Sequence, residues 1–136
     1  MADTIGGACL CGGVTFELAA RPSYVVHCHC TMCRRAHGAG VVTWASFPVS
    51  ALRLTAGADR LVDYHSSAEA VRRFCGVCGA SLFFESRKWP GQLDVALANL
   101  TAPLAEQPMM HVWWNEHVPW LVLGDDLPRR DDPTAT

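Results

Sequence analysis

Three closely spaced cysteines, in the segment HCHCTMCRR (27–35), are the residues of this sequence best suited to chemistry. In an extended strand Cys28 and Cys30 point to the same side, and a turn after Cys30 brings Cys33 back toward them. Three protein ligands with one remaining position are typical of a zinc site that is open to water or substrate. The spacing therefore predicts an open zinc site at these three cysteines.

A closed structural site is the alternative, with a histidine as the fourth ligand. The nearby histidines are His27, His29 and His37. Strand alternation directs His29 away from Cys28 and Cys30, which disfavours that residue. The sequence leaves the choice between an open and a closed site undecided.

The other four cysteines form two pairs that lie far apart along the chain. They are Cys9 and Cys11 in GACLCGG, and Cys75 and Cys78 in FCGVCGA. A C-x-x-C turn aims both sulfurs at one point, and the following Gly79 leaves room for backbone amides near the thiolates. Two such pairs predict a closed Cys₄ zinc site that joins distant strand ends, with buried free cysteines as the alternative.

The charge of a three-thiolate site restricts the chemistry it can perform. Zinc with three thiolates carries a net charge of about −1, which weakens it as a Lewis acid, yet it still deprotonates an incoming thiol. The resulting complex is more negative and needs cations nearby. Arg34 and Arg35 follow Cys33 directly. They are candidates for that role, and an ordinary solvated pair is the alternative.

Composition places the chain among single-domain globular proteins and limits its partners. Its 136 residues are 50% hydrophobic and 18% charged, which predicts one domain over 1–136 with its own core. A net charge of −2 disfavours broad nucleic-acid binding. No run of about 18 apolar residues and no signal peptide is visible, so we expect no membrane span and a cytoplasmic location. Seven cysteines, an odd number, suit metal ligands better than a disulfide framework.

The elements that must position these cysteines are short strands. Alternating apolar and polar runs, separated by Gly, Pro, Ser and Asp, predict an antiparallel all-β domain with little helix. The expected strands cover residues 14–18, 25–29, 41–47, 60–64, 71–74, 81–86, 93–98, 111–114 and 120–123. A helical turn is expected at 101–107, and the polar tail from about 125 to 136 is expected to fray.

Taken together, these motifs resemble the glutathione-dependent formaldehyde-activating (GFA) domain family. The resemblance runs from GACLCGGVTFEL through HCHCTMCRRAHGAG, FCGVCGASLFFE and LDVALANL to HVWWNEHVPWLVLGDDLP, and this chain is a short single-domain case. It implies a β-tent of antiparallel sheets pinned by two zinc ions per chain. It also implies that the Cys₄ set is structural and that the set of three is the catalytic or ligand-binding site.

The family resemblance implies a zinc-dependent carbon–sulfur lyase that forms or cleaves a thiol–aldehyde adduct, as in the condensation of glutathione with formaldehyde. Cys30, Cys33 and His111 are then the expected catalytic residues, with His37 and Glu116 as further candidates for the proton donor. The residues expected to hold the thiol's carboxylates are Arg34, Arg35, Arg73 and Lys88. Trp44, Trp113 and Trp114 are expected in the core or the pocket wall.

Two other functions remain open at this point. A non-catalytic zinc protein could bind or carry glutathione or another small thiol. An interaction module could use both zinc ions structurally. An open fourth position separates the interaction module from the other two functions, and turnover separates the enzyme from the carrier.

Overall fold

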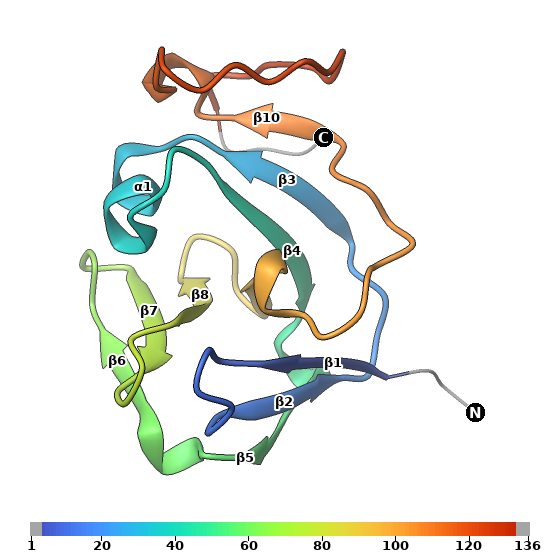
Figure 1. The fold of residues 1–136 in the computed structure, drawn as a ribbon, viewed down its shortest axis with the longest axis vertical. Helices are drawn as coiled ribbons and strands as arrows, with labels where there is room; N and C mark the ends of the chain where they lie inside the picture. Colours follow the sequence, from blue (N-terminus) through green and yellow to red (C-terminus); the bar gives the residue numbers. More distant parts are fainter. Residues whose placement is uncertain (1–3, 133–136) are drawn as a thin grey trace.

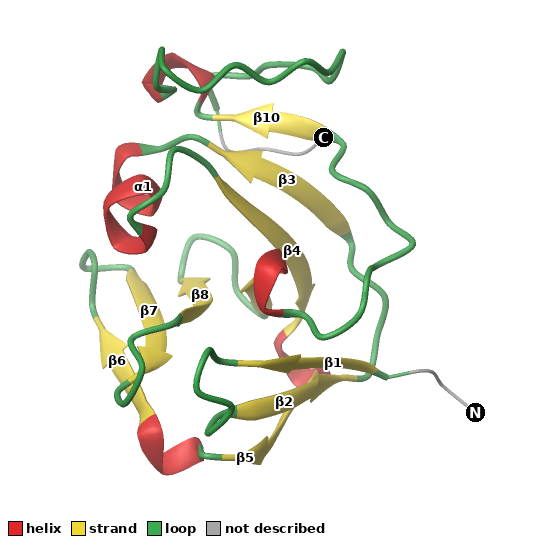
Figure 2. Ribbon diagram, in the orientation of Figure 1, coloured by secondary structure: helices red, strands yellow, loops and turns green. Residues whose placement is uncertain are grey.

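The computed structural model describes residues 4–132, which form two β-sheets and one α-helix (Figures 1 and 2). The smaller sheet has the strand order β1-β2-β5 and the larger one β10-β3-β4-β9-β8-β7-β6. The strands are β1 (Ile5–Ala8), β2 (Thr15–Leu18), β3 (Tyr24–Cys28), β4 (Val42–Pro48), β5 (Leu52–Ala56), β6 (Leu61–Tyr64), β7 (Ala70–Cys75), β8 (Ser81–Ser86), β9 (Gln92–Ala96) and β10 (Met110–Val112). The all-β prediction is confirmed.

One strand pairing differs from the purely antiparallel arrangement that was expected. β10 pairs with β3 in parallel, with His111 opposite His27. The chain leaves β9 through the 3₁₀ turn Leu97–Asn99 and returns along the side of the molecule to the far edge of the larger sheet (Figure 1). Alternation along a strand carries no information on strand direction, so the sequence pattern could not reveal this crossover.

The α-helix, α1 (Thr31–His37), occupies the place where only a turn was expected. Its N-cap is Cys30, whose sulfur accepts a hydrogen bond from the Cys33 amide at 3.2 Å. Gly38 ends the helix in the left-handed region, with φ of 60°, a conformation that glycine adopts without strain. No helix within residues 4–132 is long and apolar enough to cross a lipid bilayer.

Three other local predictions need correction. Residues 101–107 are not helical, and residues 120–123 do not form a strand. The expected frayed tail also differs from the structure, because the Arg130 amide donates to the His111 carbonyl at 2.9 Å and the His111 amide to the Pro128 carbonyl at 2.8 Å. Backbone pairing with β10 thus holds the first part of the tail, whose polar sequence gave no sign of it. Residues 133–136 lie outside the described part.

The main hydrophobic core fills the space between the two sheets. Phe16 of β2 meets Phe83 of β8 edge-on, with ring centroids 4.9 Å apart. Val25, Ala45 and Val95 reach the same core from neighbouring strands of the larger sheet and are fully buried. Each large side chain buried in this way contributes about 1.5–3 kcal/mol relative to exposure. A second cluster on the other face of the larger sheet contains Val26, Cys28, Cys33, Val42, Trp44, Ala96, Met110 and Val112.

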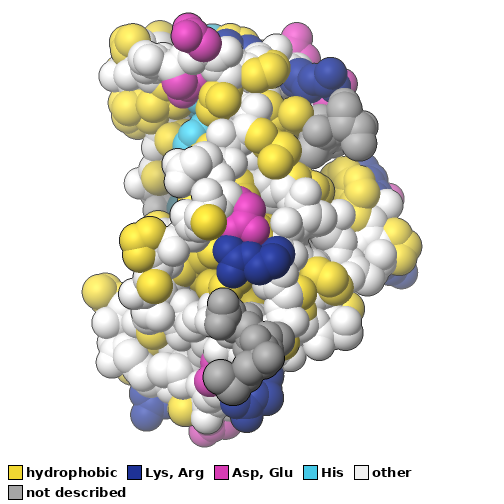
Figure 3. All heavy atoms as spheres, turned by 90° about the vertical axis from the view of Figure 1, so that its right-hand side faces the viewer, with side chains coloured by type: hydrophobic (Ala, Val, Ile, Leu, Met, Phe, Trp, Pro, Cys, Tyr) yellow, Lys and Arg dark blue, Asp and Glu magenta, His cyan; other side chains and the backbone are white. Residues whose placement is uncertain are grey.

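Charged side chains do not gather on the face of the molecule shown in Figure 3. There, Lys and Arg side chains alternate with Asp and Glu in small mixed groups between hydrophobic patches. Exposed cations pair with nearby carboxylates, as Arg21 does with Glu106 and Arg53 with Glu17. Such exposed pairs contribute little to stability.

Candidate metal centres and active-site cavity

The first cysteine group joins the β1–β2 loop to the turn between β7 and β8. The ligand atoms of Cys9, Cys11, Cys75 and Cys78 all lie within 4.8 Å of one another. The Cys9 and Cys11 sulfurs are 3.6 Å apart, and those of Cys11 and Cys75 are 3.9 Å apart. Two strand ends that are 64 residues apart in sequence therefore share one cluster of four sulfurs, the donor set of a structural zinc site.

Backbone amides around this group favour thiolates over thiols. The Val14 amide donates to the Cys9 sulfur at 3.2 Å, and the Gly13 amide donates to the Cys11 sulfur at 3.4 Å. Hydrogen bonds from the Ala80 and Cys11 amides lower the pKa of Cys78 to about 6. A divalent metal binds cysteine as the thiolate, and hydrogen bonds from backbone amides stabilise that charged form. The four residues therefore fit a metal ion.

The second group brings together the three cysteines of the opening motif. The ligand atoms of Cys28, Cys30 and Cys33 lie within 4.8 Å of one another, and the Cys28 and Cys33 sulfurs are 3.7 Å apart. Cys28 ends β3 and Cys33 lies in the first turn of α1, so the helix brings its cysteine back to the strand end. Three converging sulfurs also fit a metal ion.

The histidines considered as a fourth ligand have other contacts. His27 Nδ1 lies 2.8 Å from the Thr43 hydroxyl, and the His37 ring packs edge-on against Trp44. His29 bonds a distant histidine, as described below. Within residues 4–132, no His, Cys, Asp or Glu adds a fourth ligand atom to the group of three. This geometry favours the open site over the closed one.

Arg72 of β7 is the cation that contacts the three-cysteine group. Its Nη1 and Nη2 atoms donate to the Cys33 sulfur at 3.7 and 3.6 Å, and its guanidinium lies over the Phe84 ring, 4.9 Å from the centroid. Hydrogen bonds from Cys28 and Cys30, and then the charge of Arg72, hold the pKa of Cys33 far below its usual range. Arg72 is not among the cations predicted from the sequence, although strand alternation places it on the opposite side from its neighbour Arg73.

The cations predicted to hold a substrate have different positions. Arg34 donates to the His29 carbonyl at 3.3 Å and to the Thr31 hydroxyl at 3.2 Å, which ties the start of α1 to β3. Arg73 bonds Asp63 at 3.2 Å and also Glu85.

The other two predicted cations are exposed. Lys88 lies at the main cavity, 3.8 Å from Glu69. Arg35 lines a second, adjacent cavity together with Arg73. Of the four predicted cations, Lys88 therefore reaches the main cavity.

A cavity of about 430 Å³ opens beside the three-cysteine group. Strand register explains its floor, because Tyr24, Ser46, Asp94, Phe84 and Arg72 lie opposite one another on five neighbouring strands. Residues in register across an antiparallel sheet share one face. The floor therefore runs from a tyrosine through a carboxylate to the arginine that contacts sulfur.

The walls of this cavity are largely aromatic and apolar. Trp44 and Trp113 line it, as predicted for the pocket wall, along with Val26 and Val112. Trp113 has φ of 55°, the one positive value among described residues other than glycine. A left-handed backbone at a bulky residue is strained and persists where surrounding contacts enforce it, often at functional sites.

Asp94, in the middle of β9, lines the cavity but is not among the site residues predicted from the sequence. Burial raises its pKa from 3.8 to about 6, despite a hydrogen bond from Gln92, and the negative charge of Cys33 raises it further. Gln92 Nε2 donates to Asp94 Oδ1 at 3.2 Å and also bonds the Tyr24 hydroxyl. The available signal was one carboxylate within the apolar run LDVALA, on the polar side of its alternation.

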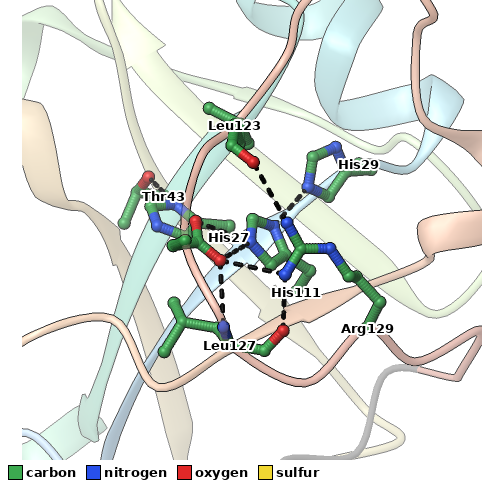
Figure 4. A network of polar contacts seen from close by, with 8 residues as sticks. His27, His29, Thr43, His111, Leu123, Leu127 and Arg129 are labelled. Carbon is green, nitrogen blue, oxygen red and sulfur yellow. Dashed lines mark hydrogen bonds and ion pairs between the residues drawn. The ribbon is translucent and has the colours of Figure 1, made fainter.

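His111 is part of a buried polar network on the tail side of β3 (Figure 4). It is fully buried, its Nδ1 lies 2.8 Å from His29 Nε2, and its Nε2 lies 3.0 Å from Asp125 Oδ1. Arg129 donates to the same carboxylate oxygen at 3.0 Å and lies over the Trp114 ring. Both ring nitrogens of His111 are thus engaged, and His111 does not line the cavity, contrary to its predicted role as proton donor.

The two other predicted proton donors are also less suitable than expected. Glu116 lines the cavity, but its Oε1 accepts a hydrogen bond from the Thr31 amide at 2.7 Å, which lowers the pKa of this carboxyl. His37 lines the adjacent cavity, and burial lowers its pKa. Both residues favour the form that has already lost its proton.

Comparison with known proteins agrees with this geometry. Residues 4–116 match the family described as glutathione-dependent formaldehyde-activating enzyme (GFA). The chain belongs to the GFA family. A Halomonas elongata protein, provisionally named a glutathione-dependent formaldehyde-activating enzyme, is 23% identical over 130 residues, which cover 85% of this chain and 78% of the relative.

A solved structure supports the fold of this GFA family member. A crystal structure of a Rhodobacter sphaeroides protein superposes with a TM-score of 0.63 at 27% sequence identity. The match covers 91% of this chain and 98% of the other. The predicted GFA resemblance is thereby confirmed at the level of family and fold.

Proposed function

We propose that this GFA family member is a zinc-dependent carbon–sulfur lyase that forms or cleaves the adduct of a small thiol and an aldehyde, of the S-hydroxymethylglutathione type. The observation that carries the proposal is the three-cysteine group beside a cavity whose floor holds a cation and a carboxyl group. The family's description names glutathione and formaldehyde, which fit this chemistry. Two zinc ions per chain complete the proposal, one in each cysteine group.

The two groups differ in what their ligands allow. Four sulfurs complete a tetrahedron, so Cys9, Cys11, Cys75 and Cys78 would hold a structural ion that ties the two sheets together. At the group of three, bound zinc would supply a low thiol pKa for an incoming substrate. The remaining chemistry belongs to the protein's own residues.

Three features of the protein would promote the reaction. Arg72 offsets the negative charge that a second sulfur anion brings next to Cys33. The apolar walls around Trp44 and Trp113 would lower the local dielectric, which strengthens electrostatic interactions within the cavity. The cavity also holds thiol and aldehyde together, which converts a bimolecular encounter into an oriented one.

Glutathione is a candidate thiol because it carries two carboxylates. Lys88 at the main cavity and Arg35 at the adjacent one are cations that could bind them, and the two cavities share Met32, Trp44, Ser66 and Arg72. Free thiols at both metal groups suit a reducing compartment, so we also propose a cytoplasmic location.

A thiol carrier without turnover is the second candidate, because an open three-sulfur site binds a thiol in either case. The test is magnetisation-transfer NMR of glutathione and formaldehyde at equilibrium with the zinc-loaded protein. We expect wild type to accelerate exchange between free and hydroxymethylated glutathione, and Cys30→Ser and Cys33→Ser to leave the background rate. A background rate with wild type that still binds glutathione would favour the carrier.

The interaction module with two closed zinc sites is the least supported function. It requires a fourth protein ligand at the group of three, whereas the histidines nearest in sequence contact other groups. Cobalt substituted at this group should change its absorption when glutathione, cysteine or a dithiol is added. An unchanged spectrum with all three thiols would restore the closed-site interpretation.

A further inference from the structure

The cavity contains three acidic side chains with different surroundings. The Glu69 carboxylate lies 3.8 Å from the Lys88 Nζ atom, and the Glu116 carboxylate accepts a hydrogen bond from the Thr31 amide. Asp94 has no ion pair among the described residues, and the side chain that donates to it, Gln92, is neutral. A carboxyl group without a cation is the one most able to hold a proton at neutral pH.

Asp94 is also the acid best placed relative to the sulfurs. It lies in register with Phe84, and Phe84 lies in register with Arg72, whose guanidinium contacts the Cys33 sulfur. Neighbouring strands are about 4.8 Å apart, so two strand spacings separate the backbone of Asp94 from that of Arg72. Both side chains face the same cavity, across which a small adduct bound at the cysteines would extend.

We propose that Asp94 is the catalytic residue that exchanges a proton with the hydroxyl oxygen of the thiol–aldehyde adduct, an inference that rests on the proposed lyase function. Geometry carries it: an unpaired carboxyl group on the floor of the cavity, one aromatic ring away from the arginine that contacts the ligand sulfur. Of the residues predicted for this role, His111 bonds Asp125 outside the cavity and His37 lines the adjacent cavity. Glu116 lines the main cavity, but its carboxylate accepts a hydrogen bond from the Thr31 amide.

The step balances in both directions. In condensation the thiolate sulfur attacks the aldehyde carbon, the carbon–oxygen π bond breaks toward oxygen, and the oxygen takes the proton of the Asp94 carboxyl group. The proton that the thiol lost then restores the neutral carboxyl group through solvent. In cleavage the Asp94 carboxylate removes the hydroxyl proton, the carbon–oxygen double bond re-forms, and the carbon–sulfur electron pair returns to sulfur. No oxidant or reductant is needed.

The surroundings of Asp94 suit both directions near neutral pH. Because burial raises its pKa to about 6, both the acid and the base form are populated in mildly acidic to neutral solution. General acid–base catalysis is most effective under that condition, and a positioned group typically contributes about 10²–10⁴-fold. Gln92 holds the carboxyl group by a hydrogen bond at 3.2 Å that does not require it to be charged.

The test measures the exchange rate from pH 5 to 8 in zinc-loaded full-length protein. We expect Asp94→Asn to lower the catalysed rate by about 10²-fold or more and to remove a pH dependence centred near 6. Asp94→Glu should retain part of the rate with a displaced midpoint. Thiol binding, followed by cobalt absorption, should persist in both variants. Glu17→Gln changes a carboxyl group on β2 that does not line the cavity and should preserve the wild-type profile.

The outcomes separate this inference from the function on which it rests. Catalysis by wild type with an unchanged rate and pH profile in Asp94→Asn would overturn the role of Asp94 and leave the lyase intact. A background exchange rate with wild type itself would overturn both. A loss of rate that follows loss of thiol binding would make Asp94 a binding residue and also contradict the proposal.

Discussion

Replacing Asp94 with asparagine should remove a contribution to stability that falls as pH rises. The native carboxyl group has a pKa of about 6, whereas the ordinary value is 3.8. Between these values the unfolded chain releases a proton that the native protein retains, so the contribution of Asp94 to stability falls as pH rises. Each pH unit corresponds to about 1.4 kcal/mol, and because the unfolded carboxyl group is already more than half ionised at pH 4, about 2.4 kcal/mol is lost in wild type between pH 4 and 7.

Asparagine has nearly the same shape and can retain hydrogen bonds to the neighbouring side chains, but it does not titrate. The stability of Asp94→Asn relative to wild type should therefore rise by about 2.4 kcal/mol from pH 4 to pH 7. With a urea dependence of about 2 kcal/mol per molar, the variant's midpoint should move up by about 1.2 M relative to wild type over that range.

Urea unfolding at matched zinc concentrations measures this difference. The pKa of His29 is lowered to about 4 by burial, which makes wild type lose stability as pH falls from 6.5 toward 4, in the opposite sense to Asp94. That contribution and metal binding are common to both proteins and cancel in the comparison. A difference that stays constant with pH, or that shrinks as pH rises, would refute the interpretation of Asp94 as a buried, unpaired carboxyl group.

Three other predictions concern the metal groups and the tail. Cys75→Ser should unfold the chain, because structural metal sites supply folding free energy directly. Cys30→Ser should keep the native circular dichroism spectrum and bind one metal ion fewer. Equal metal loss and equal unfolding in the two variants would contradict different roles for the two cysteine groups. Arg72→Gln should raise the pH at which the three-cysteine group takes up cobalt, because it removes the guanidinium that contacts the Cys33 sulfur. Arg73→Gln changes an arginine that is paired with carboxylates and should leave this pH unchanged. Matching cobalt uptake curves for the two variants would exclude a role of Arg72 in stabilising the Cys33 thiolate. Asp125→Asn should be less stable than wild type at neutral pH, because hydrogen bonding to the buried His111 lowers the pKa of the Asp125 carboxyl group to about 2. The difference in stability should disappear as pH falls toward 2. A difference that persists in acid would show that the charge of Asp125 is not the cause.

The sequence by itself determined the two cysteine groups that could hold metal ions and the fold class. The spacings C-x-C and C-x-x-C place sulfurs side by side through local backbone geometry, so both sets of cysteines could be selected without knowing the fold. Short alternating runs indicated an all-β domain for the same reason, because alternation is a property of each strand alone. The helix that brings Cys33 to the strand end was missed, since seven residues after a short strand give little periodicity.

The tertiary structure decided which side chains surround the metal groups. Arg34 and Arg35 are adjacent to the cysteines in sequence, yet Arg72, 39 residues away from Cys33, contacts the ligand sulfur. Strand register across five strands puts Asp94 on the cavity floor, and the parallel pairing of β10 buries His111 against the tail. Alternation along a strand shows that neighbouring residues face opposite sides of a sheet. It does not show which side faces the core and which faces a cavity, because that depends on how distant strands pair and pack.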